Sequence, residues 1–196
     1  MLEIRTHGRG GQGAVVASEI LAAAFFKEGK HVQSFPTFGV ERRGAPVAAF
    51  TRVDDRPIQL RCEVYEPDHV MVLGETLVES LDVTAGLKDG GWVIINTELP
   101  PSDFNFPDKF RVATVDASGI AVKHGLGSVT SPIVNTSILG AFCKVTGAVS
   151  LESIAASIKD YVPMKADANV KAACEAYDSV RMGKVGAPDE FHADQT

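Results

Sequence analysis

The chain has 196 residues, of which 45% are hydrophobic and 22% are charged, and its formal net charge is −6. A chain of this length buries most of its apolar surface in one core, so size and composition indicate a globular domain. The acidic balance, with Arg42 and Arg43 as the only adjacent arginines, argues against a nucleic-acid partner. No apolar run reaches the roughly 20 residues that span a bilayer, and the N-terminus lacks a signal-peptide pattern. We therefore expect no membrane association and a cytoplasmic location.

Hydrophobic periodicity predicts alternating strands and helices along the first two thirds of the chain and three helices in the last third. Strands are expected at residues 2–7, 31–35, 47–53, 58–61, 69–73, 92–95 and 110–115, and helices at 14–28, 75–87, 117–124, 135–145, 151–162 and 168–182. This order predicts an α/β fold of the doubly wound, Rossmann-like class, with a mainly parallel sheet and helices on both faces. The first strand, helix and second strand form a βαβ unit, and 47–53 with 58–61 form a β-hairpin excursion. Residues 1–183 are expected to be a single domain, and the polar residues 184–196 an extended C-terminal tail.

The residue types that usually carry catalysis or metal binding form no motif in this sequence. Cys62, Cys143 and Cys174 are far apart and make no C-x-x-C pair, and the five histidines show no metal-ligand spacing. The nucleophile motif G-x-S-x-G, the zinc motif H-E-x-x-H and a Walker lysine are all missing from the sequence. The sequence therefore predicts no catalytic residue, no bound metal and no iron–sulfur cluster in this chain.

The most informative stretch is a glycine-rich loop at residues 6–13, between the first strand and the first helix. Gly8, Gly10 and Gly13 match the pattern G-x-G-x-x-G in the strand–loop–helix context that this pattern requires. Glycines let a ligand approach the backbone closely, and a helix N-terminus presents unpaired N–H groups, so the loop is a candidate anion site. A tight turn without a ligand is the structural alternative. His7 either hydrogen-bonds a bound anion or simply ends the strand.

A second loop, predicted at residues 35–46 from its prolines and glycines, carries two arginines. The dinucleotide fingerprint requires an acidic residue about 20 residues beyond the glycines, at the end of the second strand, and the first acid here is Glu41. Arg42 and Arg43 instead suit a phosphate, either the 2′-phosphate of NADP or a phosphate of coenzyme A. Ion pairs of Glu41 and the two arginines at the surface or at a subunit interface are the alternative.

Two motifs in this order resemble the gamma subunit of the 2-oxoacid:acceptor oxidoreductases, a family that includes the pyruvate:ferredoxin enzyme. They are His-Gly-Arg-Gly-Gly-Gln-Gly at residues 7–13 and Ser-Phe-Pro-Thr-Phe-Gly-Val-Glu-Arg-Arg-Gly-Ala-Pro-Val at 34–47. Residues 135–140, Asn-Thr-Ser-Ile-Leu-Gly, are similar to a later helix start of the family. The resemblance implies a subunit of an enzyme that converts a 2-oxoacid and coenzyme A to acyl-CoA and CO2 and reduces ferredoxin or another acceptor.

The resemblance also implies a division of cofactors among subunits. Thiamine diphosphate and Mg²⁺ would lie in the alpha and beta subunits, [4Fe-4S] clusters in a ferredoxin-like subunit, and coenzyme A at an inter-subunit site. Carried over residue by residue, the anion-binding loop is Gly8, Arg9, Gly10, Gly11, Gln12 and Gly13, and the coenzyme A or inter-subunit surface includes Thr37, Glu41, Arg42 and Arg43. The isolated chain would be inactive. An NAD(P)-binding Rossmann oxidoreductase and a purely structural interaction subunit are the two alternatives.

Overall fold

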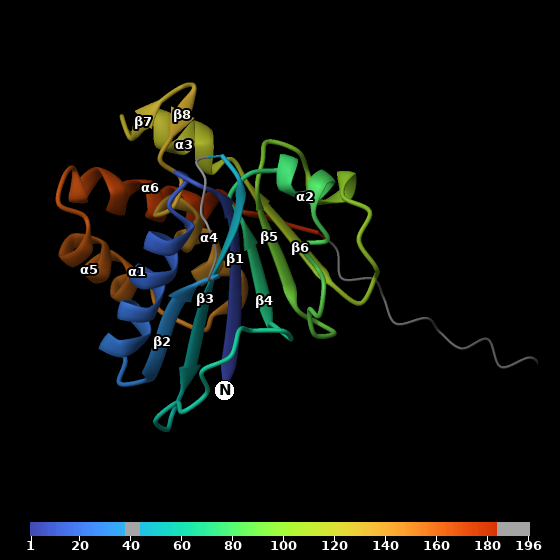
Figure 1. Ribbon diagram of the computed structural model, residues 1–196. Coiled ribbons are helices and arrows are strands. Elements are labelled where there is room, and N and C mark those ends of the chain that lie inside the picture. Colours follow the sequence, from blue (N-terminus) through green and yellow to red (C-terminus); the bar gives the residue numbers. More distant parts are fainter. Residues whose placement is uncertain (38–43, 184–196) are drawn as a thin grey trace, which may run out of the picture.

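A computed structural model describes residues 1–37 and 44–183, and this part of the chain contains a seven-stranded sheet in the order β2-β3-β1-β4-β5-β6-β9 (Figure 1). Its strands are β1 (Leu2–Arg9), β2 (His31–Pro36), β3 (Pro46–Asp54), β4 (His69–Val72), β5 (Trp92–Asn96), β6 (Arg111–Val115) and β9 (Arg181–Met182), and β7 (Gly127–Ser128) and β8 (Ser131–Pro132) form a separate small ribbon. All strands of the large sheet except β3 and β9 run in the same direction. The predicted mainly parallel α/β fold is confirmed.

The two faces of the sheet are covered very unequally. The helices are α1 (Ala14–Lys27), α2 (Thr76–Ser80), α3 (Ala117–Lys123), α4 (Ser137–Thr146), α5 (Leu151–Tyr161) and α6 (Ala166–Ser179). One core joins all of these helices except α2 to strand residues such as Ile4, Met71 and Ile94. On the other face, α2 and the loops around it pack over Val72 and Ile95 in a smaller cluster. Helices thus lie on both faces, but the second face depends mainly on loops (Figure 1).

The predicted hairpin between 47–53 and 58–61 is wrong. Residues 58–61 form no strand, and β3 pairs antiparallel with β1 along one edge and with β2 along the other. The first βαβ unit is therefore split, because β3 lies between its two parallel strands. The chain after β3 is held by the buried Arg52, whose guanidinium donates to the carbonyls of Cys62 at 2.8 Å and Glu63 at 3.0 Å. These carbonyls find a side-chain donor in place of a strand partner.

The helix predicted at 75–87 is also wrong, since α2 ends at Ser80. The buried guanidinium of Arg5 donates to the carbonyls of Val83 at 3.1 Å and Ala85 at 2.6 Å, which a helix would use internally. The Asp82 side chain accepts the backbone N–H two residues further on at 3.0 Å, a turn that competes with helix formation. The apolar residues of this segment still pack against the sheet, and their spacing resembles that of the buried face of a helix.

The three helices of the last third are confirmed with shifted ends, as α4, α5 and α6. The third is shorter than predicted because the chain leaves the helix after Ser179 and adds β9 to the edge of β6. Helices α4 and α6 approach closely at Gly140, where a Cβ would lie 1.8 Å from the carbonyl oxygen of Ala173. The tail predicted at 184–196 lies outside the described residues, and the single domain at 1–183 stays a prediction.

Candidate functional site

The glycine loop connects β1, which ends at Arg9, to α1, which begins at Ala14. Gly11 and Gly13 have φ of 98° and 81°, in the region that favours glycine. A Cβ on Gly8 would lie 3.0 Å from the Cβ of Ala14, so a side chain there would push the strand away from the helix. The loop therefore requires its glycines for its shape as well as for any ligand.

The later motif at residues 135–140 packs directly against this loop. A Cβ on Gly13 would lie 2.7 Å from Nδ2 of Asn135, so the two motifs touch although they are far apart in sequence. The next residue, Thr136, donates through its hydroxyl to Oδ1 of Asn169 on α6 at 2.7 Å. Thr136 thereby ties this motif to helix α6, and Asn135 packs against the glycine loop.

The glycine loop is also joined to the C-terminal end of the arginine-bearing segment, whereas Thr37, at its N-terminal end, bonds to β3. The N–H of Gly10 donates to the carbonyl of Ala45 at 2.9 Å, and the N–H of Gly44 donates to the carbonyl of Gly10 at 3.1 Å. The guanidinium of Arg9 donates to the carbonyl of Gly44 at 3.3 Å. Thr37 donates to the carbonyl of Ala48 on β3 through its N–H at 2.8 Å and its hydroxyl at 3.0 Å.

The structure therefore brings together the six predicted residues of the glycine loop, Gly8, Arg9, Gly10, Gly11, Gln12 and Gly13, and attaches residues 44 and 45 to them. Thr37 bonds to β3 and to no loop residue in the described part of the chain. Glu41, Arg42 and Arg43 lie outside the described residues. Their predicted role stays a prediction.

Several N–H groups of the loop have no acceptor within the described residues. Among residues 1–37 and 44–183, the amides of Gly11, Gly13 and Ala14 donate to no carbonyl or side chain. The first turn of α1 carries no acidic residue and no side-chain cap. With the guanidinium of Arg9 beside them, these donors can accommodate an anionic group at the rim of the loop.

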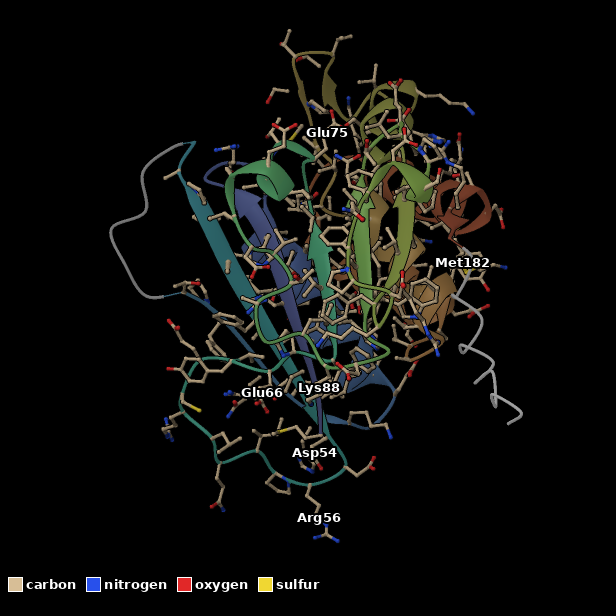
Figure 2. The ribbon with its side chains drawn as sticks, turned by 90° about the vertical axis from the view of Figure 1, so that its right-hand side faces the viewer. Asp54, Arg56, Glu66, Glu75, Lys88 and Met182 are labelled. Carbon is tan, nitrogen blue, oxygen red and sulfur yellow. The ribbon has the colours of Figure 1, made fainter. Side chains whose placement is uncertain are left out.

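A cavity of about 740 Å³ opens next to the loop, at the carboxyl ends of β1, β4, β5 and β6. Ligands of open α/β sheets usually bind at this edge. The cavity is lined on one side by the glycine loop and on the other by three acidic side chains, Glu75, Glu98 and Asp116. Figure 2 shows Glu75 at this end of the molecule and Arg56 at the opposite end.

Two of these acidic side chains, Glu75 and Asp116, accept hydrogen bonds from neighbouring donors. The hydroxyl of Thr97 donates to the carboxylate of Glu75, and the N–H of Gly119 donates to Oδ1 of Asp116 at 2.7 Å as the cap of α3. A pyrophosphate in this cavity would face these carboxylates. The cavity therefore disfavours a polyphosphate, and the anion-compatible side of the loop is its rim near Arg9 and Gly44.

His7 does not contribute a positive charge to the loop. Its side chain is 8% exposed, and burial, with the nearby charge of Arg5, lowers the pKa of His7 from 6.5 to about 4. The imidazole is neutral at physiological pH, and its Nε2 has no hydrogen-bond partner in the part of the chain that the structure describes. Of the two interpretations of His7, the buried end of a strand fits better than an anion ligand.

The described residues contain no group of three or more His, Cys, Asp or Glu side chains placed to hold a metal ion. Cys143 is buried, and burial raises the pKa of its thiol to about 12, so it stays a protonated core residue. None of the helices in the described ranges is long and apolar enough to cross a membrane.

The acidic side of the cavity was not predicted from the sequence. Its residues follow the ends of three buried strands, at 73–76, 96–98 and 116–118, and each of these positions turns from apolar to polar. Because the carboxyl ends of parallel strands meet at one edge, this pattern was the available signal. Gly74, which follows the end of β4 and also lines the cavity, was not predicted either.

These features define a Rossmann-like α/β subunit whose most distinctive surface is a glycine loop bonded to a second, arginine-bearing segment. The chain belongs to the pyruvate ferredoxin/flavodoxin oxidoreductase family, whose model matches residues 3–179, and within that family to the gamma subunits. The resemblance found in the sequence motifs is confirmed.

Similar proteins support this assignment over almost the whole chain. The chain is 56% identical over 182 residues to the pyruvate/ketoisovalerate oxidoreductases common subunit gamma of Thermococcus kodakarensis, covering 91% of this chain and 96% of that protein. It is 52% identical over 186 residues to pyruvate synthase subunit PorC of Methanothermobacter thermautotrophicus, covering 94% and 99%. The crystal structure of pyruvate oxidoreductase subunit PORC from Thermotoga maritima has a TM-score of 0.78 and 38% identity, covering 93% and 98%.

Proposed function

We propose that the chain is the gamma subunit of a 2-oxoacid oxidoreductase that forms acyl-CoA and CO2 from a 2-oxoacid and coenzyme A. Its contribution is positional: the glycine loop and the segment at 37–46 border coenzyme A where it reaches the partner subunits. Fixing a reactant in place can supply much of a rate enhancement without a catalytic residue in the subunit itself.

One observation carries this proposal. The backbone bonds from Gly10 to Gly44 and Ala45 hold the glycine loop and one end of the arginine segment as a single surface. The amides of Gly11 and Gly13 and the guanidinium of Arg9 supply donors on that surface. The two motifs that resemble the family therefore converge at one place, although a helix and a strand separate them in sequence.

The cofactors of the reaction are assigned to partner subunits in this proposal. Thiamine diphosphate with Mg²⁺ belongs to the alpha and beta subunits and the [4Fe-4S] clusters to a ferredoxin-like subunit, in a cytoplasmic complex. Within this chain, the groups that suit the phosphates of coenzyme A are Arg9, the loop amides and the predicted Arg42 and Arg43. The acidic cavity does not suit them, so coenzyme A would lie along the rim and not within the cavity.

The test uses Arg42→Ala and Arg43→Ala in the assembled complex, with Arg56→Ala as the matched control. Arg56 is exposed and lies at the end of the molecule opposite to Glu75 and the cavity (Figure 2). Loss of a charge-assisted contact should raise the KM for coenzyme A about tenfold to a hundredfold, with or without weaker co-purification with the partner subunits. The control should change neither quantity.

Normal assembly with an unchanged KM in both variants would contradict the proposal. Loss of assembly with an unchanged KM in the complex that remains would favour the purely structural alternative.

A further inference from the structure

Strand β1 continues beyond the strand with which it pairs. The parallel ladder between β1 and β4 ends at the pair His7 and Val72, followed by the bond from the N–H of Leu73 to the carbonyl of His7 at 2.9 Å. Since alternate residues of a strand direct their backbone groups to the same side, the N–H of Arg9 also faces β4. The next acceptor there, the carbonyl of Leu73, already accepts the side-chain amide of Asn96 at 2.9 Å.

The side chain of Gln12 provides the acceptor that β4 does not. Its Oε1 accepts the N–H of Arg9 at 2.7 Å, and its own backbone N–H donates to the carbonyl of Arg9 at 2.9 Å. The carboxamide fills the space where β1 and β4 diverge. A Cβ on Gly74 would lie 3.3 Å from its Nε2, and a Cβ on Gly8 would lie 3.7 Å from its Oε1.

We infer that Gln12 is the positioning residue of the glycine loop: its side chain closes the turn onto the end of β1 and thereby fixes the orientation of the amides of Gly11 and Gly13, which have no acceptor among the described residues. Gly74 is required for the same arrangement, because the absence of a side chain at this position leaves room for the carboxamide of Gln12. That the oriented amides serve coenzyme A rests on the proposed function. The closing of the loop by Gln12 does not.

Two variants of Gln12 test the closing of the loop separately from the binding of coenzyme A. Gln12→Ala removes the acceptor, whereas Gln12→Glu keeps an oxygen acceptor of the same length and adds a negative charge beside the loop. In the full chain, the amide of Arg9 should exchange its hydrogen about tenfold faster in Gln12→Ala, as one hydrogen bond predicts, and at nearly the native rate in Gln12→Glu. NMR-detected hydrogen exchange measures both.

Gly74→Ala provides a second variant in which Gln12 itself is unchanged. Its new methyl group meets Nε2 at 3.3 Å and should displace the carboxamide, so the Arg9 amide should again exchange faster. Gln59→Ala is the matched control, since Gln59 is an exposed glutamine distant from the loop in sequence, and it should leave the exchange rate unchanged.

In the assembled complex, Gln12→Ala and Gln12→Glu should both raise the KM for coenzyme A, the first by loosening the loop and the second by repelling an anion. Native exchange of the Arg9 amide in Gln12→Ala would overturn the inference, whatever the KM. Faster exchange in Gln12→Ala, with near-native exchange in Gln12→Glu and an unchanged KM in both, would uphold the positioning role and overturn the coenzyme A assignment.

Discussion

Arg52 and His7 show two ways in which this fold buries a group that can carry charge. Arg52 is fully paired: its Nε donates to the carboxylate of Glu3 at 2.7 Å, and its other nitrogens donate to backbone carbonyls. His7 has no carboxylate partner in the described residues and is kept neutral by burial. The first group anchors a loop, and the second makes stability depend on pH.

The pH dependence has a defined sign. Because the pKa of His7 falls from 6.5 in the unfolded chain to about 4 in the folded chain, the folded state binds fewer protons in this window. Titration of His7 does not reduce the free energy of unfolding above pH 6.5. As the pH falls from 6.5 towards 4, it lowers the free energy of unfolding by about 3 kcal/mol. We expect His7→Gln to lose that part of the pH dependence.

Urea unfolding of the native chain and of His7→Gln at several pH values between 7 and 4 measures this difference. The carboxylates titrate in both proteins, so the difference between the two curves isolates His7. Two parallel curves would show that His7 does not titrate with the shifted pKa.

At the level of elements, the contact between α4 and α6 depends on a single missing side chain. A Cβ at Gly140 would lie 1.8 Å from a backbone carbonyl of α6, and backbone atoms cannot yield as a side chain would. We expect Gly140→Ala to separate the two helices and to lower the free energy of unfolding by about 1–3 kcal/mol. Thermal or urea unfolding of the full chain checks this, and a native stability would show that the helices slide apart at no cost.

The sequence predicted most elements but not how all of them pair. The glycine loop was found because its signal is local: four glycines between a strand and a helix. The position of β3 was missed because its residues have the same alternating pattern whether they pair with 58–61 or with β1 and β2. The segment at 75–87 was assigned to a helix because only the structure shows that Arg5 takes its carbonyls.

In the candidate site, too, the local features could be predicted from the sequence and the contacts between distant segments could not. The loop residues could be named from the sequence, and so could their connection to the helix behind them. The contacts with Asn135 and Gly74 could not, because they join segments that are distant in the chain. The acidic side of the cavity was missed because it requires the order of β4, β5 and β6, which periodicity does not provide.

For the molecule as a whole, the strand order itself disfavours dinucleotide binding. In the Rossmann arrangement the second strand lies next to the first, and an acid at its end binds the ribose. Here β3 separates β1 from β2, so the end of β2 lies two strand spacings, roughly 10 Å, from β1. Three carboxylates line the cavity in which the pyrophosphate would lie.

Isothermal titration of the purified chain with NADH and NADPH should therefore show no binding tighter than about 1 mM. Coenzyme A in the same experiment provides the comparison, and it should bind weakly at most, because its site is completed by partner subunits in the proposal. Tight binding of either dinucleotide would favour the NAD(P)-dependent alternative.

The insertion of β3 between β1 and β2 also constrains how the chain folds. Residues 1–36 contain the glycine loop and α1, but neither β1 nor β2 has a strand to pair with until residues 46–54 exist, and β1 lacks its second neighbour until β4 has been made. The central contacts are thus of high sequence separation, which slows folding. During synthesis, the glycine loop can take its final shape only after residue 72 has emerged, so the first third of the chain is exposed to misfolding until then.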